Sequence, residues 1–400
     1  MTRRISVCLI AFLVTLVCGH ELRAQDLTIT NARIIVGTGQ VIEQGAIVVR
    51  GGRIVSVAAG PVAAPGSRAI DAKGMTAIAG FVDGHRHIVQ GDAERWLNEQ
   101  SVPRMQEFLE AGYTTLVSGG GPAEPVLELK RRIDSGQLKG PRIIPSGPIN
   151  LNNSTPEMGR AAVQRLAARG VKFTGEINVN SFRPDPRQLE VLGAVTDEAR
   201  KAGVLVAVHA ASVPAMLAAV KAGAQRLVHT PHFSWLTEED AKVVKDAGVP
   251  VLSTIGFGVP VFNVFNHDNI PTFRDGGKWP DTILDGEGRG REAGYKAVNG
   301  RTLWDAGVVY GYGTDTGYLP SLGLAHELRT INLMFSPIDM VKMMGPSTAA
   351  WIDMSKDLGT LEAGKLADIV LLAGNPLDGY WNFLTAKVVI KSGEIVVDKR

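Results

Sequence analysis

The sequence predicts an α/β protein, a (β/α)8 TIM barrel joined to a small discontinuous β-sandwich domain that both ends of the chain form. In the middle of the chain, strand-like apolar runs alternate with amphipathic helical stretches, which is typical of parallel β/α units. At both ends, short β-rich runs alternate with turn residues and no helical stretch intervenes. One barrel with a second, smaller unit is the fold that accommodates both patterns.

Length and charge limit the classes of protein and of partner. The chain has 400 residues, 45% of them hydrophobic, which is more than a single minimal core needs and predicts two structural units. Of its 42 basic and 40 acidic residues, three Arg and one Glu lie in the first 24 positions, so 39 of each remain beyond them. A neutral chain gives no general electrostatic reason to bind nucleic acid or an anionic membrane.

Residues 1–25 have the composition of a secretory signal peptide. Arg3-Arg4 precedes an apolar run over residues 5–17 and a polar stretch that ends at Ala24. The apolar run is shorter than the ~20 residues that a membrane-spanning helix needs. We therefore expect cleavage after Ala24 or Gln25 and a periplasmic or secreted protein that has no membrane anchor.

The two cysteines, Cys8 and Cys18, both lie in this removable segment. The mature chain then has no disulfide and no thiolate that could act as a nucleophile or a metal ligand. Any metal ion must be bound by His, Asp and Glu.

Residues 26–75 and 357–400 are predicted to be the two halves of the β-sandwich domain. In the first half, Gly51-Gly52 separates two β-rich runs, which is a hairpin signal. In the second half, apolar runs over 366–372 and 386–390 flank a turn at Gly374-Asn375-Pro376. The halves are expected to meet because the two ends of a domain commonly lie close together.

Residues 76–356 are predicted to form the barrel. Eight strands are expected, at Thr76 to Val82, Thr114 to Ser118, Arg142 to Ser146, Phe173 to Ile177, Val204 to Val208, Gln225 to Val228, Val249 to Ser253 and Val308 to Gly311. Helical stretches between them include residues 103–111, 161–169, 187–201, 213–221 and 238–246. In such barrels the functional groups lie at the carboxyl ends of the strands.

Histidines and carboxylates follow five of these strands. His85 and His87 follow the first strand, and since residues i and i+2 of a strand point to the same side, their imidazoles converge on one spot. Glu176 lies at the end of the fourth strand, and His209, His229 and Asp315 follow three others. Imidazoles and carboxylates at one mouth are a ligand set for zinc or a similar divalent ion. The sequence therefore predicts a metal centre at the carboxyl ends of the strands.

This pattern resembles the metal-dependent amidohydrolase superfamily, which includes imidazolonepropionase, enamidase and prolidase, over nearly the whole mature chain. The resemblance implies that His85 and His87 bind one metal ion and that His209 and His229 bind a second. It implies that Asp315 binds the first ion and also acts as the catalytic base. The implied cofactor is two divalent ions, with zinc expected and iron, manganese or cobalt as alternatives.

The fourth strand offers two candidates for a ligand shared by both ions. Members of the superfamily use a carbamylated lysine or a glutamate there, and this chain has Lys172 near the start of the strand and Glu176 near its end. Because the carboxyl end of the strand is the metal end, position favours Glu176 and leaves Lys172 in solvent. If neither residue reaches the metal, a site with one ion is expected.

Two further features concern the substrate. His232, on the loop after His229, is a candidate substrate-binding residue, or else a loop histidine with a local hydrogen bond. The connection from Gly256 to about Asn299 is long and rich in apolar residues. It is expected to be either a lid that supplies an apolar substrate wall or a subunit interface.

These observations predict an exported, metal-dependent hydrolase of a C–N bond in a small amide, dipeptide-like or cyclic amide substrate. A homo-oligomer is expected only because members of the superfamily commonly form one. One alternative is a mononuclear aminohydrolase that deaminates a heterocycle, and another is a metal-free binding module. The superfamily's deaminases commonly have a glutamate shortly after the fifth-strand histidine, whereas Ala210-Ala211-Ser212-Val213 follows His209 here. This difference counts against deamination.

Overall fold

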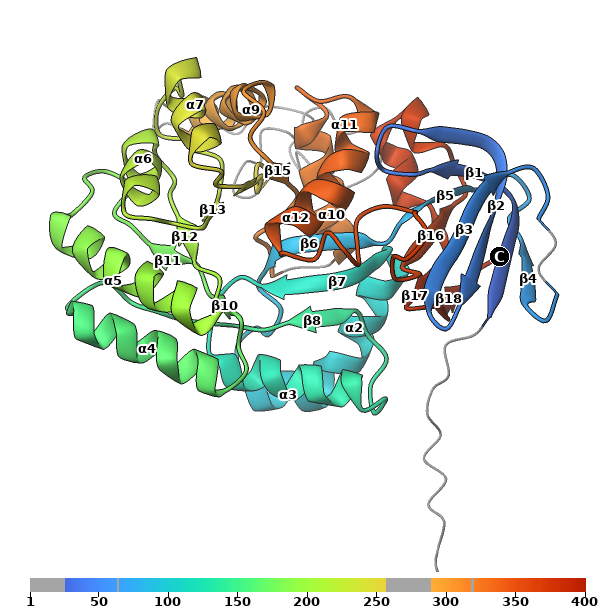
Figure 1. Cartoon of the computed structure of the whole chain (residues 1–400), viewed down its shortest axis with the longest axis horizontal. Coiled ribbons are helices and arrows are strands. Elements are labelled where there is room, and N and C mark those ends of the chain that lie inside the picture. The colour runs from blue at the N-terminus through green and yellow to red at the C-terminus, as the bar shows by residue number, and fades with distance from the viewer. Residues whose placement is uncertain (1–25, 63–64, 257–288, 318–319) are drawn as a thin grey trace, which may run out of the picture.

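The computed structural model describes residues 26–62, 65–256, 289–317 and 320–400. A series of parallel strands with helices beside it leads into one sheet that both ends of the chain build (Figure 1). The predicted signal peptide lies outside the described residues, and so does most of the segment for which a lid was predicted. No helix in the described ranges has the length and apolarity that crossing a membrane requires.

Eight strands from the two ends of the chain form a single sheet. Their order is β18-β17-β16-β5-β1-β2-β3, with β4 beside β1. The strands are β1 (Leu27–Ile35), β2 (Val41–Arg50), β3 (Arg53–Ala59), β4 (Arg68–Asp71), β5 (Thr76–Ala79), β16 (Ile369–Leu372), β17 (Ala386–Lys391) and β18 (Glu394–Asp398).

The junction between the two ends is the antiparallel pair of β5 and β16, in which Thr76 faces Leu372 and Ala79 faces Ile369. The hairpin predicted at Gly51-Gly52 is present between β2 and β3, and both glycines have positive φ, as this tight turn requires. The two ends of the chain thus share one sheet, whereas the two-layer sandwich stays a prediction.

Among the described residues, ten short parallel strands make up the middle of the chain. They are β6 (Phe81–Arg86), β7 (Tyr113–Ser118), β8 (Arg142–Ile144), β9 (Ser146–Gly147), β10 (Phe173–Thr174), β11 (Ile177–Asn178), β12 (Ala207–His209), β13 (Arg226–Val228), β14 (Val251–Leu252) and β15 (Tyr310–Gly311). Backbone hydrogen bonds join the two ends of this series, since Gly84 N donates to Tyr312 O and Asp315 N donates to His85 O. The middle of the chain is therefore TIM-barrel-like.

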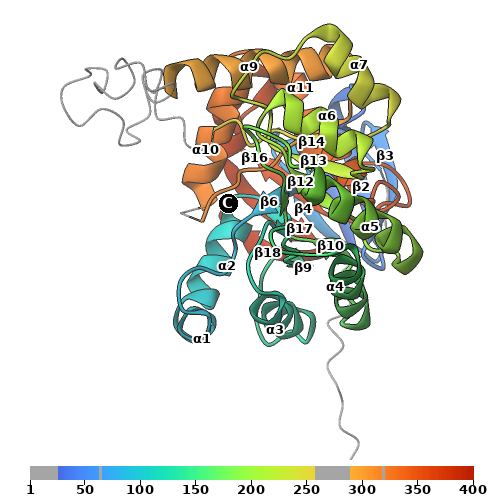
Figure 2. The ribbon, with the colours of Figure 1, turned by 90° about the vertical axis from the view of Figure 1, so that its left-hand side faces the viewer.

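Helices lie outside these strands (Figure 2). The α-helices are α1 (Ala93–Arg95), α2 (Ser101–Glu110), α3 (Ala123–Asp134), α4 (Pro156–Ala168), α5 (Pro186–Ala202), α6 (Val213–Lys221), α7 (Glu238–Asp246), α9 (Arg289–Asp305), α10 (Pro320–Ile331), α11 (Pro337–Lys342) and α12 (Thr348–Trp351). π-Helical turns occur at η1 (Trp96–Gln100) and η3 (Met343–Ser347), and 3-10 turns at η4 (Pro376–Asp378) and η5 (Tyr380–Leu384). All five helical stretches expected from the sequence are present.

The prediction of one strand from Thr76 to Val82 is wrong, because the chain changes sheets at Gly80. β5 belongs to the chain-end sheet and β6 to the parallel series. A Cβ atom at Gly80 would lie 2.3 Å from the side-chain oxygen of Thr114, so the close approach of β7 requires glycine at this position. The apolar run over residues 76–82 continues through Gly80, so the sequence gives no sign that the chain changes sheets there.

The amino ends of the parallel strands are filled by side chains. The indole ring of Trp351, from α12, stacks on Phe173 with ring centroids 6.1 Å apart, and its Nε1 donates to Leu227 O. Val82, Val117 and Leu252 belong to the same buried cluster. Because apolar packing fills this end, the polar residues that follow the strands gather at the opposite end.

A buried carboxyl group fixes the end of β14 to α10. The two oxygens of Glu327, which is 1% exposed, accept hydrogen bonds from the Ser253 hydroxyl and from the backbone N–H groups of Ile255 and Gly256. Burial raises the pKa of Glu327 from the ordinary 4.5 to about 7.

We predict that Glu327 makes stability depend on pH. Because its folded-state pKa exceeds its unfolded-state pKa, the folded protein holds an extra proton between pH 4.5 and about 7. The free energy of unfolding should therefore fall by up to about 3 kcal/mol as the pH rises through this window. Urea unfolding of the wild type and of Glu327→Gln, which cannot titrate, should show this slope in the wild type only. Parallel pH profiles would contradict the assignment.

Candidate metal centre

The six residues predicted from the sequence as metal ligands lie together at the carboxyl ends of the strands. They form two groups in which one potential ligand atom from each residue lies within 4.8 Å of the others. The first group contains His85, His87, Glu176 and Asp315, and the second contains Glu176, His209 and His229. Glu176 is the one residue that belongs to both groups.

The carboxylate of Glu176 lies between the two histidine pairs. Its Oε2 atom is 2.8 Å from His209 Nδ1 and 2.9 Å from His229 Nε2. Its Oε1 atom is 3.9 Å from His87 Nε2, on the other side. A carboxylate in this position has one oxygen available to each of two ions.

Asp315 faces the first histidine pair. Its Oδ1 atom is 2.9 Å from His87 Nε2 and 3.2 Å from His85 Nε2, while its Oδ2 atom is 3.9 Å from His229 Nδ1. His85 Nε2 is completely buried, yet it makes no hydrogen bond with any part of the chain that the structure describes. A buried imidazole nitrogen without a hydrogen bond, close to two carboxylates, suits a metal ligand.

The electrostatics of the cluster favour the protonation states that metal binding needs at Glu176, Asp315 and His229. At His85, burial lowers the pKa, but the Asp315 and Glu176 carboxylates outweigh it and raise the pKa above its ordinary value. Burial alone raises the pKa of Glu176, but hydrogen bonding to His209 and His229 outweighs it and holds the pKa well below the ordinary value. In the same way His85 and His87 hold the pKa of Asp315 below its ordinary value against the effect of burial. Burial lowers the pKa of His229 to about 4. The cluster thus presents ionised carboxylates and a neutral imidazole.

Backbone conformation aims three side chains of the site. His229, Thr254 and Asp315 each follow a strand and have φ of 77°, 41° and 52°, in the left-handed region that residues with a Cβ rarely adopt. Each such residue costs on the order of 1–3 kcal/mol, and such residues cluster at functional sites. The Thr254 hydroxyl lies 2.7 Å from His229 Nδ1 and so fixes the orientation of that ring.

The glycine-rich turn Ser118-Gly119-Gly120-Gly121, which follows β7, also contributes to the site. A Cβ atom at Gly119 would lie 2.6 Å from the His85 ring, and Gly119 O accepts a hydrogen bond from Glu176 N. The backbone can pass this close to His85 only because residue 119 is glycine. Sequence analysis had no signal for this role beyond the run of glycines itself.

The alternative candidate on the fourth strand, Lys172, lies at the other end of the strands. Lys172 is exposed to solvent. It lines a separate cavity with Arg142, Arg169 and Ile352, and none of the clustered histidines lines that cavity. Glu176, and not Lys172, is the fourth-strand residue that the fold brings to the histidines. Glu176 reaches the histidines because it lies at the carboxyl end of the strand, where the candidate metal ligands gather.

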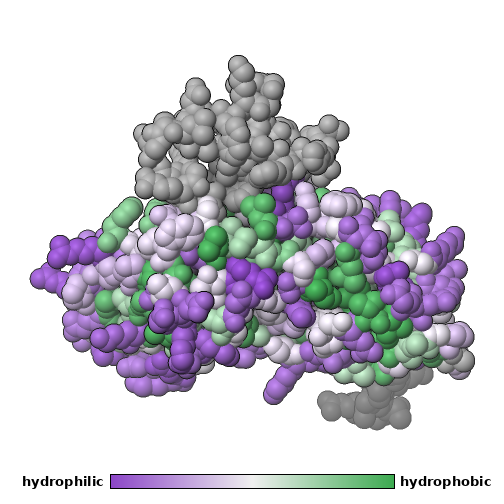
Figure 3. Space-filling view, turned by 90° about the horizontal axis from the view of Figure 1, so that it is seen from above, coloured by the Kyte–Doolittle hydropathy of each residue, from purple (hydrophilic) through white to green (hydrophobic). Residues whose placement is uncertain are grey.

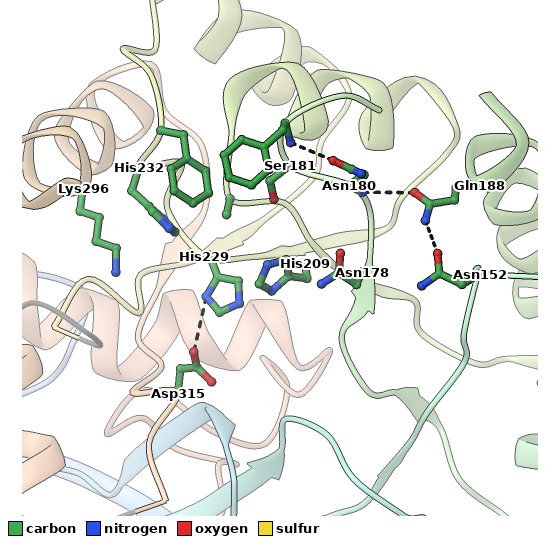
Figure 4. Close-up of a pocket in the computed structure, with 13 residues that line it drawn as sticks. Asn152, Asn178, Asn180, Ser181, Gln188, His209, His229, His232, Lys296 and Asp315 are labelled. Atoms are coloured by element: carbon green, nitrogen blue, oxygen red, sulfur yellow. Dashed lines mark hydrogen bonds and ion pairs between the residues drawn. The ribbon is translucent and has the colours of Figure 1, made fainter. Parts of the chain in front are cut away.

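A pocket of about 560 Å³ opens over the cluster (Figure 4). His232 lies on its wall, where its Nδ1 atom is 3.1 Å from Thr230 O. Sequence analysis missed several polar residues that also line the pocket, and these are Asn152, Asn178, Asn180, Gln188 and Lys296. Asn178 ends β11 and Asn180 follows it, but their amide side chains are not typical metal ligands, and the other three residues follow no strand directly, so no pattern in the sequence marks the group.

Comparison with known proteins identifies the family. A model of the amidohydrolase family matches residues 76–396. The chain belongs to the amidohydrolase family. The resemblance inferred from the motifs is therefore confirmed, and the family together with the His/Glu/Asp cluster indicates a divalent metal.

Two relatives and one solved structure illustrate what this amidohydrolase is similar to. Imidazolonepropionase of Thermoanaerobacter pseudethanolicus is 23% identical over 389 residues, 84% of this chain and 86% of that protein. A 5-methylthioadenosine/S-adenosylhomocysteine deaminase of Symbiobacterium thermophilum is 25% identical over 409 residues, 87% and 85% of the two chains. A Xaa-Pro dipeptidase with bound methionine shares the fold with a TM-score of 0.77, at 22% identity over 93% of this chain and all of that one. The protein is a hydrolase that acts on carbon–nitrogen bonds.

We predict that the Thr254 hydroxyl strengthens metal binding through the candidate ligand His229. Thr254→Val keeps the shape and β-branching of the side chain but removes the hydroxyl, so metal affinity should fall by about 10- to 100-fold. Competition with a chelator measures this change. Thr254→Ser, which keeps the hydroxyl, should bind metal like the wild type, and equal losses in both variants would refute the role of the hydrogen bond.

Proposed function

We propose that this amidohydrolase is an exported, binuclear enzyme on a (β/α)8 barrel that hydrolyses the C–N bond of an amide, dipeptide-like or cyclic amide substrate. The observation that carries the proposal is the Glu176 carboxylate between two histidine pairs. A shared carboxylate suits two ions better than one, because a single ion cannot use both histidine pairs at ordinary ligand distances.

The proposed ligand sets follow from the distances. His85 and His87 hold one ion together with Asp315, and the orphaned His85 Nε2 supports this assignment. His209 and His229 would hold the second ion, and Glu176, which belongs to both groups of residues, would be a ligand available to each. Nitrogen and oxygen donors suit zinc, which we propose as the metal, and equally suit iron, manganese or cobalt.

The catalytic role falls to Asp315. Bound divalent ions supply polarisation of the substrate carbonyl and lower the pKa of water toward about 7. Asp315 takes a proton from the attacking water and returns it to the leaving nitrogen, so that a C–O bond forms as the C–N bond breaks and the amine leaves neutral. Its lowered pKa keeps the carboxylate ionised at neutral pH.

Domain limits and location are part of the same proposal. The predicted boundary at 75/76 is moved to Gly80, because β5 pairs within the chain-end sheet; we propose a barrel over residues 80–356 and a β-sandwich domain from 26–79 and 357–400, supported by the hydrogen bonds that join both ends of the parallel series and by the shared chain-end sheet. Export to the periplasm or the medium rests on the composition of residues 1–25.

A second candidate function is deamination of a heterocycle at a site with one ion. Similarity to the Symbiobacterium thermophilum deaminase favours it, whereas the apolar run Ala210-Ala211 after His209 counts against it. An assay for released ammonia over nucleosides and pterins separates this activity from amide hydrolysis.

We predict that protein purified without added metal contains about two equivalents of divalent ion per chain, and that Glu176→Ala lowers this toward one or none. Elemental analysis measures the content. Lys172→Ala is the matched control and should leave it unchanged. One equivalent that is insensitive to Glu176→Ala would replace the binuclear proposal with a mononuclear one.

We also predict that Asp315→Asn retains bound metal but loses turnover, because the amide cannot accept the proton. The value of kcat should fall by about 100-fold or more. Asp353→Asn, at the opposite end of the strands and also at positive φ, should have near-wild-type kcat. A near-wild-type kcat in Asp315→Asn would refute the assigned role.

A further inference from the structure

Two charged side chains of β6 lie in the interior of the protein. On the face of the molecule in Figure 3, hydrophilic residues surround smaller groups of hydrophobic ones, as expected where charged side chains face water. Arg86 and Asp83 are instead only 1% and 0% exposed. A charge is retained in the interior only where hydrogen bonds and an opposite charge compensate for its lost hydration. Neither residue has a role in the proposed reaction, so their burial requires another explanation.

The side chain of Arg86 points away from the metal cluster, toward the helices outside the strands. Because neighbouring residues of a strand point to opposite sides, Arg86 lies behind His85 and His87. Its guanidinium carbon is 4.9 Å from the centre of the Phe108 ring, on α2. A Cβ atom at Gly323, on α10, would lie 2.7 Å from Arg86 Nη1, so a larger residue there would have to displace the guanidinium group. Two helices therefore fix the place of this charge.

A chain of hydrogen bonds leads from Arg86 to Asp83 through two threonine hydroxyls. Arg86 Nη1 donates to the hydroxyl oxygen of Thr316 and, at 3.1 Å, to that of Thr314. The Thr316 hydroxyl donates to Thr314 Oγ1 at 3.2 Å, and the Thr314 hydroxyl donates to Asp83 Oδ2 at 2.7 Å. Each hydroxyl proton thus has a defined acceptor. A chain that begins at a cation and ends at an anion strengthens every bond in it, because all of its dipoles point the same way.

The two threonines are the chain neighbours of Asp315, the proposed catalytic base. Asp315 has a φ of 52°, a conformation that a residue with a Cβ holds only when its surroundings impose it. The backbone of Thr314 is fixed as well as its hydroxyl, because its N–H donates to Asp83 Oδ1 at 3.0 Å. The backbone oxygen of Thr316 accepts from His87 N at 3.3 Å. Both neighbours of Asp315 are therefore tied to β6.

The same strand carries the two histidines that the Asp315 carboxylate faces. His85 O accepts from Asp315 N at 2.8 Å, and His85 N donates to Asp83 Oδ1 at 3.2 Å. The Asp315 Oδ1 atom is 3.2 Å from His85 Nε2 and 2.9 Å from His87 Nε2. A shift of either threonine would move this carboxylate relative to both imidazoles. The hydrogen-bond chain behind the strand thus controls distances within the candidate metal centre.

We propose that Arg86 is a positioning residue that, through the two threonine hydroxyls, holds the Asp315 carboxylate at the distance from the histidines of β6 that metal binding and proton transfer require. This inference rests on the proposed role of Asp315 as metal ligand and base, and it adds the group that fixes that carboxylate. Arg86 acts only through Thr314 and Thr316 and takes no part in the chemistry itself. The buried pair of opposite charges is retained because it determines the geometry of the site.

The matched variants Thr316→Val and Thr316→Ser test this role without removing a charge. Valine keeps the shape of threonine but lacks the hydroxyl, whereas serine keeps the hydroxyl. With the dipeptide or cyclic amide that the wild type hydrolyses fastest, Thr316→Val should lower kcat by about 10- to 100-fold and leave KM within about 3-fold, because a slightly misplaced base costs this much. Thr316→Ser should have near-wild-type kcat.

Arg86→Met should reproduce the loss of kcat, and Arg86→Lys, which keeps the charge but not the planar set of donors, should restore part of it. Thr330→Val is the control for the loss of a buried hydroxyl elsewhere, since Thr330, on α10, is 1% exposed and its hydroxyl donates to a backbone oxygen of the same helix. It should lower the unfolding temperature at most and leave kcat unchanged. An equal loss of kcat in Thr330→Val would overturn the assigned role.

Two measurements without substrate keep this inference separate from the proposed function. Competition with a chelator gives the affinity of each protein for zinc, and crystal structures of the metal-free proteins give the distance from Asp315 Oδ1 to His87 Nε2. Thr316→Val should bind zinc about 10- to 100-fold more weakly than the wild type and should show a longer distance. Thr316→Ser and Thr330→Val should match the wild type in both measurements.

The outcomes separate the two proposals. If the wild type hydrolyses no amide yet the Asp315 carboxylate moves in Thr316→Val and not in Thr316→Ser, the proposed function fails and the positioning role stands. If the carboxylate keeps its place and zinc affinity is unchanged in Thr316→Val, the positioning role is overturned whatever the activity. The threonine variants decide the matter even where Arg86→Met does not fold.

Discussion

The carboxylate of Glu176 sets the geometry on which the rest of the centre depends. It contacts His209 and His229 through one oxygen and faces His87 with the other. Such a group can lie between four histidines only if five separate strands end at the same level, which parallel strands with common twist achieve. The helices and loops of the middle of the chain serve to keep those strand ends in register.

This arrangement has an energetic cost that other parts of the molecule offset. Two carboxylates are brought close together in a partly buried site, and three residues around them hold left-handed backbone conformations. The apolar cluster around Trp351 at the opposite end of the strands stabilises the fold without touching the site. The strained residues thus lie at the carboxyl ends of the strands, where loops can bind substrate, and the stabilising apolar packing lies at the amino ends.

The sequence predicted the candidate ligands because they lie at or just after the carboxyl ends of runs that the alternation of strands and helices marks as barrel strands. Lys172 and Glu176 could be ranked by the same rule, since only the end of a strand faces the mouth. By contrast, Gly80 lies inside an unbroken apolar run, and the change of sheet there depends on the approach of Thr114 from another strand. Lys296 and Gln188 lie on helices, and only the tertiary fold brings them to the pocket. Contacts between residues far apart in the sequence produce no periodic pattern of apolar residues, so such contacts cannot be predicted from the sequence alone.

The pairing of β5 with β16 has a consequence for how the protein is made. β5 is synthesised early, but its antiparallel partner lies near the end of the chain. While the ribosome is still translating the middle of the chain, β5 has an open edge that another nascent chain could pair with. The native sheet can close only when translation is almost complete, so the parallel series between β5 and β16 is synthesised while the edge of β5 is still unpaired. The chain-end sheet can thus be completed only after its last strands have been synthesised.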